Sequence, residues 1–478
     1  MAESSLPYNY NPQTPFVDTG LKEEQEWALD YTRKDCLLAR LLERGVLGGT
    51  TQDYPSGGSK TTFELVVGNS ASGGLPDSNN SFAAIGRYNE TNSKVSITPF
   101  FDYGRATMTQ QEMETLIPGT KAYYSRKEVK LRGILDTRNI RFSAQMYGTG
   151  KYGQMTQVTS TGGGQTIASA TTEYTPTVKQ IERLPINQDI LILTSAGAPI
   201  MDMPLAVVKN IGSAKSGEGT VKLVFPTYTS GSPQIPNDAI FAVPNAINTA
   251  DSNANLFYLN GLKEMIGTGA HPRSEGNNVQ NSQPQYTSEV LSLSSGQKID
   301  IWKMLWLYQR IKKNAVGHGM NVDAADIRLE NFDEQGYVRP AEFVWLVHPD
   351  TKLYLLKSFY DGKAEVKIDG GFKMGSTMDE GIRYDTFMGV PIMEDLLCGP
   401  EDAFLMHMKG IGRSVLYPWG PMPLTTTEWV RTPTTGNYEL LRRWAQNFVP
   451  LYRDVLGRIE AASGETLGVT EASMINGN

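Results

Sequence analysis

The sequence predicts an α+β protein, and three observations carry this prediction. A helical pattern of apolar residues runs over about 123–146, two alternating β-like runs precede it, and short apolar runs bounded by turn residues follow it. The 478 residues are long enough for two or three domains. Hydrophobic residues at 40% with 20% charged residues are typical of a folded chain rather than a disordered one.

The N-terminal segment predicts an arm followed by a helix. Residues 1–20 carry prolines and asparagines without periodicity, which indicates an extended arm. They lack the basic start and apolar run of a secretory signal, and no stretch of the chain approaches about 18 uncharged apolar residues. An amphipathic helix is expected over 21–44, with Gly45 as its stop. Its apolar stripe consists of Trp27, Tyr31, Leu38, Leu41 and Leu42.

The two β-like runs predict an extended ribbon over 51–107. They read KTTFELVV (60–67) and KVSITPFFDYGRATMT (94–109), and the polar segment between them is too long for a tight hairpin turn. A two-stranded ribbon is marginal alone in water, so we expect it to lie against another chain. The candidate inter-subunit contacts are Phe63, Leu65, Val67, Val95, Ile97 and Phe101 of the ribbon, with Trp27 and Tyr31 of the preceding helix.

The long helix over about 123–146 is predicted to bury an apolar stripe. Charged residues fill most of its other positions, and its basic residues fit either phosphate contacts or inter-subunit salt bridges. The expected stripe is Tyr124, Leu131, Leu135, Phe142 and Met146, and the basic residues are Lys127, Lys130, Arg132, Arg138 and Arg141.

A literal G-x-G-x-x-G follows this helix at Gly148, Gly150 and Gly153. In dinucleotide-binding sites the motif follows a strand and opens a helix, so that the pyrophosphate meets the helix N-terminus. Here it ends a helix and opens a polar segment rich in Gly, Ser and Thr, which is the reverse order. The sequence therefore argues against a dinucleotide site.

Short strands and two more helices are expected after residue 175. A helix over about 295–314 has Ile299, Trp302, Leu305, Trp306 and Ile311 on its apolar side. A second helix opens at about 351, behind a buried strand. Inserted loops are expected over 155–180 and 208–238, and a polar loop over 267–288. The predicted strands are 189–194, 221–226, 239–244, 342–349, 389–395 and 403–408, with a β-like run over 447–462.

No constellation of catalytic or metal-ligating residues stands out, so we predict no catalytic residue, cofactor or metal site. The four histidines have no metal-ligand spacing, and His348 is expected to be a strand-end residue. The two cysteines, Cys36 and Cys398, are expected to pack, and the net charge of −7 argues against a dedicated nucleic-acid binder. Three acidic pairs in polar turns are expected to be solvated rather than catalytic. They are Asp379-Glu380, Glu394-Asp395 and Glu401-Asp402.

Three stretches resemble the major capsid proteins of tailed bacteriophages, a family whose fold is shared with herpesvirus capsid floors and encapsulins. VKLRGILDTRNIRFSAQMYGTG (129–150) is similar to that family's spine helix with its terminal Tyr/Phe-Gly-x-Gly turn. NLFYLNGLKEMIG (255–267), together with 299–311 and 342–358, is similar to the middle of its core. The segment 384–418 is similar to its Gly-x-Pro segment, with Gly389, Pro391, Glu394 and Asp395 in place.

The resemblance, over about 60–460, implies a fold and a set of parts. These are an N-terminal arm with its helix (1–50), an extended loop (51–107), a peripheral domain with the spine helix (108–175), an axial domain and core (176–420), and a return to the peripheral domain with a C-terminal tail (421–478).

It also implies a function: a structural protein that assembles into the icosahedral head around a double-stranded DNA genome. The implied partners are further copies of the chain in hexamers and pentamers, scaffold, portal and decoration proteins, and packaged DNA in weak non-specific contact, with no membrane. The implied location is the virion, after assembly in the host cytoplasm. Two alternatives stay open: a bacterial nanocompartment shell or another virion structural protein, and an enzyme that uses the loop at 148–153 or the acidic pairs.

Overall fold

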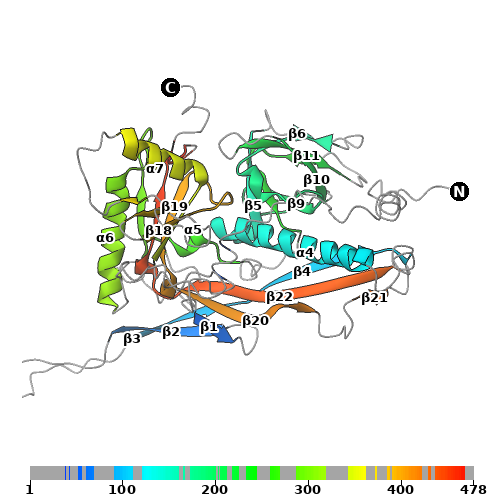
Figure 1. The fold of residues 1–478 in the computed structure, drawn as a ribbon, viewed down its shortest axis with the longest axis horizontal. Helices are drawn as coiled ribbons and strands as arrows, with labels where there is room; N and C mark the ends of the chain where they lie inside the picture. Colours follow the sequence, from blue (N-terminus) through cyan, green and yellow to red (C-terminus); the bar gives the residue numbers. More distant parts are fainter. Residues whose placement is uncertain are drawn as a thin grey trace, which may run out of the picture.

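The computed structural model describes two residues of the N-terminal segment and most of the chain between 52 and 468. The described residues are 38, 42, 52–55, 61–68, 91–110, 121–160, 165–166, 173–200, 203, 205–212, 218–225, 233–244, 259–269, 287–318, 343–361, 372–373, 385–387, 390–421, 429–431, 437–463 and 465–468. Their helices and strands confirm the α+β prediction. Figure 1 shows a long helix on an extended sheet, a β-rich part above it, and a helix-covered sheet at its C-terminal end.

The long helix α4 (Lys121–Tyr147) packs on a five-stranded sheet, and its bounds confirm the predicted helix. The longest strand, β22, pairs antiparallel with β4 on one side and with β20 on the other. A short parallel strand, β1, adds to β20. The strands are β1 (Gln52–Pro55), β4 (Phe100–Met108), β20 (Ile411–Pro421), β21 (Val430–Arg431) and β22 (Tyr438–Pro450).

Burial along α4 differs from the predicted stripe. Phe142 and Met146 are buried as expected, but Leu131 is 37% exposed and Leu135 is only half-buried. The helix instead buries Ile134 and Ile140, and from residue 142 to its end every side chain is buried. The reason is that the last turns of α4 enter the space between the sheets, where they are surrounded on all sides. Of the predicted stripe, the side chain of Tyr124 lies outside the described residues.

The β-rich part is a closed barrel. The strands predicted at 189–194, 221–226 and 239–244 are confirmed in it, whereas its other strands lie mostly where loops are expected. Its strands follow one another in the order β10-β9-β13-β5-β8-β11, and β11 pairs back with β10 to close the ring. β7 continues β8 along β11. The strands are β5 (Gln154–Ser160), β7 (Glu173–Tyr174), β8 (Thr177–Val178), β9 (Asp189–Leu193), β10 (Ala206–Ile211), β11 (Gly219–Val224) and β13 (Ile240–Ala242), with a separate pair β6 (Gln165–Thr166) and β12 (Gln234–Ile235).

The loops expected over 155–180 and 208–238 are therefore wrong where these strands lie. The sequence of β5, QMTQVTS, offers only Met155 and Val158 to the barrel interior, between polar residues. Such a strand needs few apolar residues, because barrel strands alternate inward and outward side chains and the other strands supply the rest of the core. The polar composition of β5 was the reason why the sequence predicted a loop there.

The third part is a seven-stranded mixed sheet with two helices on one face and a short helix in the apolar cluster on the other. In β15, Phe343, Trp345 and Val347 contact the core beneath α6 and α7, while Val344 and Leu346 face the end of α4. The strand order is β14 (Glu289–Ser292), β23 (Leu456–Glu460), β19 (Asp402–His407), β15 (Phe343–Val347), β18 (Val390–Glu394), β17 (Asp385–Phe387) and β16 (Phe372–Lys373). The helices are α5 (Leu262–Met265), α6 (Ile301–Gly317) and α7 (Pro349–Asp361).

Helix α6 begins six residues later than predicted, and the predicted apolar side is confirmed for Ile299, Leu305 and Ile311, which pack in the core. Asp300 caps it, accepting a hydrogen bond from the Lys303 amide at 2.8 Å. The predicted apolar side is wrong for Trp302 and Trp306, which are exposed. The first turns of α6 carry apolar residues on nearly every side, so the periodicity did not predict which side of the helix packs on the sheet. The buried residues are Met304, Leu307, Tyr308, Ile311 and Ala315.

The predicted ribbon is present but shorter than expected. Strands β2 (Thr61–Gly68) and β3 (Thr91–Ile97) pair antiparallel, with Phe63 opposite Val95. The second β-like run breaks at Thr98-Pro99, and β4 then leaves the ribbon to pair with β22. Phe101 therefore belongs to the five-stranded sheet. The other contact candidates, namely Trp27, Tyr31 and the side chains of Phe63, Leu65, Val67, Val95 and Ile97, lie outside the residues whose side chains are described.

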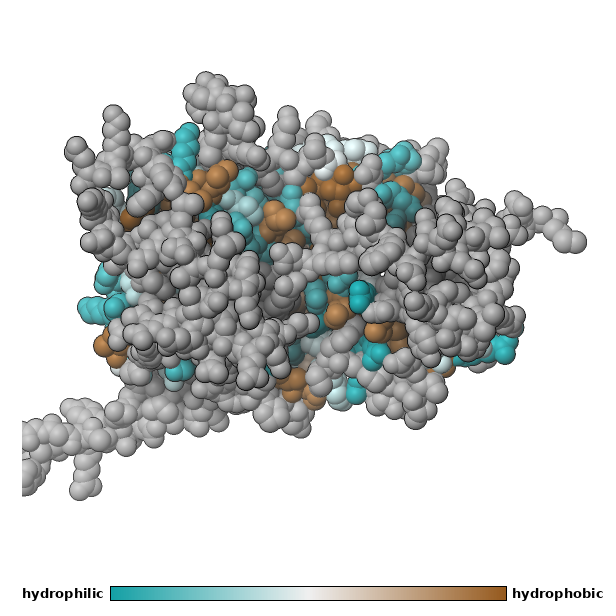
Figure 2. Space-filling view, viewed as in Figure 1, coloured by the Kyte–Doolittle hydropathy of each residue, from teal (hydrophilic) through white to brown (hydrophobic). Residues whose placement is uncertain are grey.

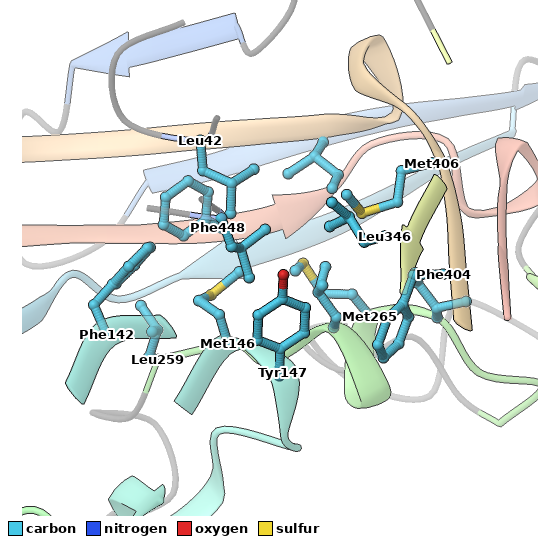
Figure 3. Packing of buried hydrophobic residues seen from close by; sticks show 14 of the residues in the cluster. Leu42, Phe142, Met146, Tyr147, Leu259, Met265, Leu346, Phe404, Met406 and Phe448 are labelled. Atoms are coloured by element: carbon cyan, nitrogen blue, oxygen red, sulfur yellow. The ribbon is translucent and has the colours of Figure 1, made fainter. Parts of the chain in front are cut away.

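The five-stranded sheet, α4 and the mixed sheet meet in one apolar cluster at the end of α4 (Figure 3), whereas the barrel has a separate core that Ala144 of α4 joins. Leu38 and Leu42, both helical and fully buried, belong to this cluster, as the predicted N-terminal stripe required of them. Labelled members are Leu42, Phe142, Met146, Tyr147, Leu259, Met265, Leu346, Phe404, Met406 and Phe448.

We expect Phe142→Ala to destabilise the subunit by about 3–5 kcal/mol, because Phe142 is buried and its ring lies 5.4 Å from that of Trp444. Leu131→Ala, on the exposed side of the same helix, is the matched control and should cost less than about 1 kcal/mol. Chemical denaturation of both variants checks the difference. Equal losses would show that the burial pattern of α4 is misassigned.

Candidate functional site

The glycines after α4 form a close backbone contact with the segment that opens α5. Gly150 has a φ of 74°, and a Cβ atom there would lie 1.8 Å from the carbonyl oxygen of Leu259. A Cβ on Gly261 would lie 2.1 Å from the Gly148 carbonyl oxygen. The amides of Gly261 and Lys263 donate to the carbonyls of Thr149 and Gly148, each at 3.1 Å. These glycines therefore allow two backbones to touch.

The same geometry supports the sequence argument against a dinucleotide. The motif ends α4 as predicted, and a short 3₁₀ turn η1 (Lys151–Gly153) then leads directly into β5. The polar loop expected at this point is thus a strand. Gly148 and Gly150 lie against the backbone of 259–263 at the start of α5, where the amides of Gly261 and Lys263 already donate to the carbonyls of Thr149 and Gly148 and not to a ligand phosphate.

A buried carboxylate lies next to this contact. Asp395 accepts hydrogen bonds from the hydroxyl of Tyr147 at 2.9 Å, the amide of Leu38 at 3.2 Å and the amide of Leu397 at 2.9 Å. It thus joins the end of α4, the N-terminal segment and the turn after β18. The pair Glu394-Asp395 was expected to be solvated, which is wrong for Asp395 because it is buried and its two oxygens accept from these three donors.

The pair Glu401-Asp402 is also not a solvated turn. Lys263 of α5 lies 3.2 Å from Glu401 and 2.5 Å from Asp402, and Asp402 is buried. Gln180, just before the turn η2 (Ile181–Arg183), donates to Glu401. Arg183 donates to the Leu397 carbonyl at 2.9 Å, so the barrel is tied to the mixed sheet. The remaining pair, Asp379-Glu380, lies outside the described residues.

The pKa directions describe a structural cluster rather than a reactive one. Burial raises the pKa of the Tyr147 phenol and of the Cys398 thiol well above their ordinary values, and the nearby acidic residues add to both. Burial also opposes ionisation of Glu401, but Lys263 and Arg183 outweigh it and lower its pKa. A thiol held protonated in this way is a poor nucleophile at neutral pH. Cys398 packs, as predicted.

The described histidines have ordinary partners. His348 is buried at the end of β15, where its Nδ1 accepts from the Asp350 amide at 3.2 Å, and burial lowers its pKa. His318 lies 2.8 Å from Asp454, and His407 packs against Phe343 at 4.7 Å between ring centroids. Within the described part of the chain, no group of three or more His, Cys, Asp or Glu residues is placed to hold a metal ion.

Two of the basic residues of α4 are used inside the subunit. The Arg138 guanidinium is buried, with its central carbon 4.4 Å from the Trp444 ring centroid. Lys130 donates to the Thr107 carbonyl of β4 at 2.5 Å. For Arg138, neither a phosphate contact nor an inter-subunit salt bridge fits this burial. Its stem and guanidinium instead hold α4 against β22.

One face of the five-stranded sheet exposes aromatic and arginine side chains. β4 buries Phe100 and Asp102 toward the subunit interior, while Phe101 and Tyr103 are 39% and 55% exposed on the other face. On that face Arg443 lies over the Tyr417 ring at 3.6 Å. Aromatic and arginine side chains are enriched in protein interfaces. The alternation of side chains along β4 was the sequence signal that could have placed Tyr103 on the exposed face. No sequence signal predicted the contact between Arg443 and Tyr417.

The surface drawn in Figure 2 mixes hydrophilic and hydrophobic residues in small groups wherever it is coloured. Of the helices in the described part of the chain, none has the length and apolarity to cross a membrane.

Comparison with solved structures finds capsid shells and an encapsulin. The capsid of cyanophage A-1(L) matches with a TM-score of 0.47 and 10% identity, covering 91% of this chain and 94% of that one. The capsid of cyanophage P-SCSP1u matches with a TM-score of 0.38 and 11% identity, covering 97% and 99%. The SrpI encapsulin from Synechococcus elongatus matches with a TM-score of 0.37 and 7% identity, covering 91% and 93%. No protein-family model and no curated protein matches the sequence.

We expect Gly150→Ala to destabilise the subunit strongly, by more than about 3 kcal/mol, because the added methyl group would overlap the Leu259 carbonyl. Gly133→Ala is the matched control: Gly133 lies within α4 with no atom within 4 Å of the added Cβ. It should stabilise the helix by about 0.5–1 kcal/mol. Thermal unfolding distinguishes the two, and a neutral Gly150→Ala would contradict the close backbone contact.

Lys263→Met tests the ion cluster. At about pH 7 it should cost roughly 3–5 kcal/mol, because Glu401 and Asp402 lose their cation while partly buried. Burial already raises the pKa of the Asp402 carboxyl, and loss of Lys263 removes the main charge that opposes this effect, so its pKa lies further above that of the unfolded chain. Such groups favour the folded state at low pH and lose that effect as pH rises through the folded-state pKa. The penalty should therefore shrink as the pH falls toward about 4.

Lys303→Met serves as the control for this variant, since Lys303 pairs with Asp300 at the surface and should contribute less than about 1 kcal/mol. Denaturant unfolding at several pH values measures both variants. A Lys263→Met penalty that is small, or that grows as pH falls, would contradict the cluster.

Proposed function

We propose that this chain is the major capsid protein of a tailed bacteriophage, a structural subunit that assembles with copies of itself into an icosahedral head. The observation that carries the proposal is the ribbon: among the described strands, β2 and β3 pair only with each other. A ribbon of two strands lacks the core to be stable by itself in water. A neighbouring subunit supplies the missing cover.

The exposed face of the five-stranded sheet supports the same proposal. It places Phe101, Tyr103 and Arg443 beside one another, while α4 covers the opposite face. A broad sheet with one face covered inside the subunit and one carrying aromatic and arginine residues is suited to burial against another chain. Phe101, a proposed contact from the sequence, acts here from the sheet rather than from the ribbon.

The parts of the fold then take the roles that the sequence resemblance implies. We assign 1–50 to the arm, 51–107 to the extended loop, and 108–175 with 421–478 to a peripheral domain on α4. Residues 176–420 form the core and axial domain, and the barrel straddles the boundary near 175. Hexamers and pentamers, scaffold, portal and decoration proteins, weakly held DNA, assembly in the host cytoplasm and location in the virion all belong to this proposal.

The subunit needs no catalytic group for this role. Its buried ionic residues hold the parts of one chain together, and the side chains of Asp395 and Lys263 are occupied in doing so. A rigid junction keeps neighbouring interfaces at fixed angles, as closure of a symmetric shell requires.

Deleting residues 70–90 and joining β2 to β3 with a short turn should leave a folded, soluble subunit that no longer closes shells. Thermal unfolding reports the fold, and sedimentation velocity of the purified protein reports assembly. Shortening the 213–217 connection between β10 and β11 is the control for loop deletion as such. Particles of normal size from the 70–90 deletion would contradict the role of the ribbon, and an unfolded subunit would place it within the intramolecular core.

A further inference from the structure

Helix α6 carries an exposed stripe that nothing within the described chain covers. Trp302 is 72% exposed and Trp306 is 43% exposed, one helical turn apart (i, i+4). Gln309, Lys313 and Val316 follow on the same side at helical spacing, and all three are exposed. We call these five residues the α6 stripe. Exposed tryptophans are unusual, and tryptophan is among the residues most enriched at the centres of protein interfaces.

The charges next to the α6 stripe argue for a protein rather than a phosphate ligand. Arg310 lies 3.5 Å from Glu289, and its guanidinium lies 5.4 Å from the Trp306 ring centroid. Lys303 is held by Asp300 at 2.8 Å. These two cations are already matched by carboxylates of the same chain. What remains is an apolar centre of two indoles with a polar rim, which is the arrangement of a protein interface.

A second set of exposed side chains lies toward the other side of the same domain. α6 packs on β14 and β23 at one edge of the mixed sheet, whereas α7 packs on β18 beyond β15. Leu353 of α7, Glu394 at the end of β18 and Leu396 in the following turn are all exposed. We call these three residues the α7 patch. Figure 1 shows α6 along the outer edge of the domain.

We propose that the α6 stripe of one subunit docks on the α7 patch of a second copy of this chain. Rings of identical subunits need two different surfaces on each subunit, because each copy contacts its two neighbours through opposite sides. The α6 stripe and the α7 patch lie toward opposite edges of one sheet, and both contain exposed apolar side chains. Lys313 of the stripe is opposite in charge to Glu394 of the patch, whose side chain is 53% exposed and lies 3.5 Å from Lys352 of the same chain. The inference rests on the proposed shell function and names one of its contacts.

The test combines Trp302→Ala with Trp306→Ala in the full chain. Because both side chains are exposed, thermal unfolding should be unchanged, while the yield of closed particles by light scattering should fall at least tenfold. Ile186→Ala, an exposed apolar residue on the barrel part, is the control and should assemble normally. Wild-type yield from the double tryptophan variant would overturn the proposal.

A charge exchange identifies the partner surface. Lys313→Glu should reduce particle yield severalfold, and adding Glu394→Lys should restore at least half of it, because the pair regains opposite charges across the contact. Glu394→Gln in the same background is the matched control: it also removes the 3.5 Å ion pair with Lys352 but supplies no positive charge, so it should not restore assembly. Failure of Glu394→Lys to restore assembly would overturn the choice of the α7 patch.

Oxidative footprinting of the wild-type protein tests the same contact without relying on the folding of a variant. Trp302 should be protected severalfold in particles relative to dissociated subunits, and equal oxidation would overturn the proposal. If the wild-type protein forms no particles at all, the proposed shell function fails first.

Discussion

The close backbone contact between 148–150 and Gly261 holds the end of α4 against the start of α5, and the packing of the barrel and the mixed sheet follows from it. It fixes where α4 ends, where α5 begins and therefore where the barrel and the mixed sheet emerge. A side chain on Gly150 or Gly261 would push the segment 148–150 away from the segment 259–263. Around this contact, Asp395 gathers donors from α4, from the N-terminal segment and from its own turn, while Lys263 and Arg183 tie α5 and the barrel to the turns flanking Cys398.

The sequence was most informative where one pattern had only one physical solution. The helical period of the apolar residues and the glycine after them predicted the bounds of α4 closely. The continuous apolar run of β15 predicted a strand buried on both faces, as the structure has it. The prediction from sequence was wrong where the local sequence was compatible with two different structures. The first turns of α6 carry apolar residues on two sides, and the side with Met304 and Leu307 packs on the sheet while Trp302 and Trp306 are exposed. The strand β5 has too few apolar residues to stand out, because its barrel neighbours share the core.

The candidate site was harder to predict than the fold, because its residues come from distant parts of the chain. Tyr147 and Asp395 are 248 positions apart, and Lys263 and Glu401 are 138 apart. Acidic pairs in turn-like sequences are ordinarily solvated, so nothing local distinguished Asp395 and Asp402 from surface charges. Their burial follows from the junction itself, which surrounds them with donors and cations. The expected contacts of Phe63 and its ribbon neighbours stay predictions, whereas Phe101 has a defined place on an exposed sheet face.

The buried polar side chains described above hold the parts of one chain together, and three further surfaces are proposed contacts with other subunits. The ribbon, the aromatic sheet face and the α6 stripe are three such surfaces, and each is incomplete in a single chain. Electron microscopy of the purified, overexpressed protein tests this claim most directly. Closed shells with fivefold and sixfold clusters of subunits are the result that the account predicts. A homogeneous population of monomers under the same conditions would contradict it.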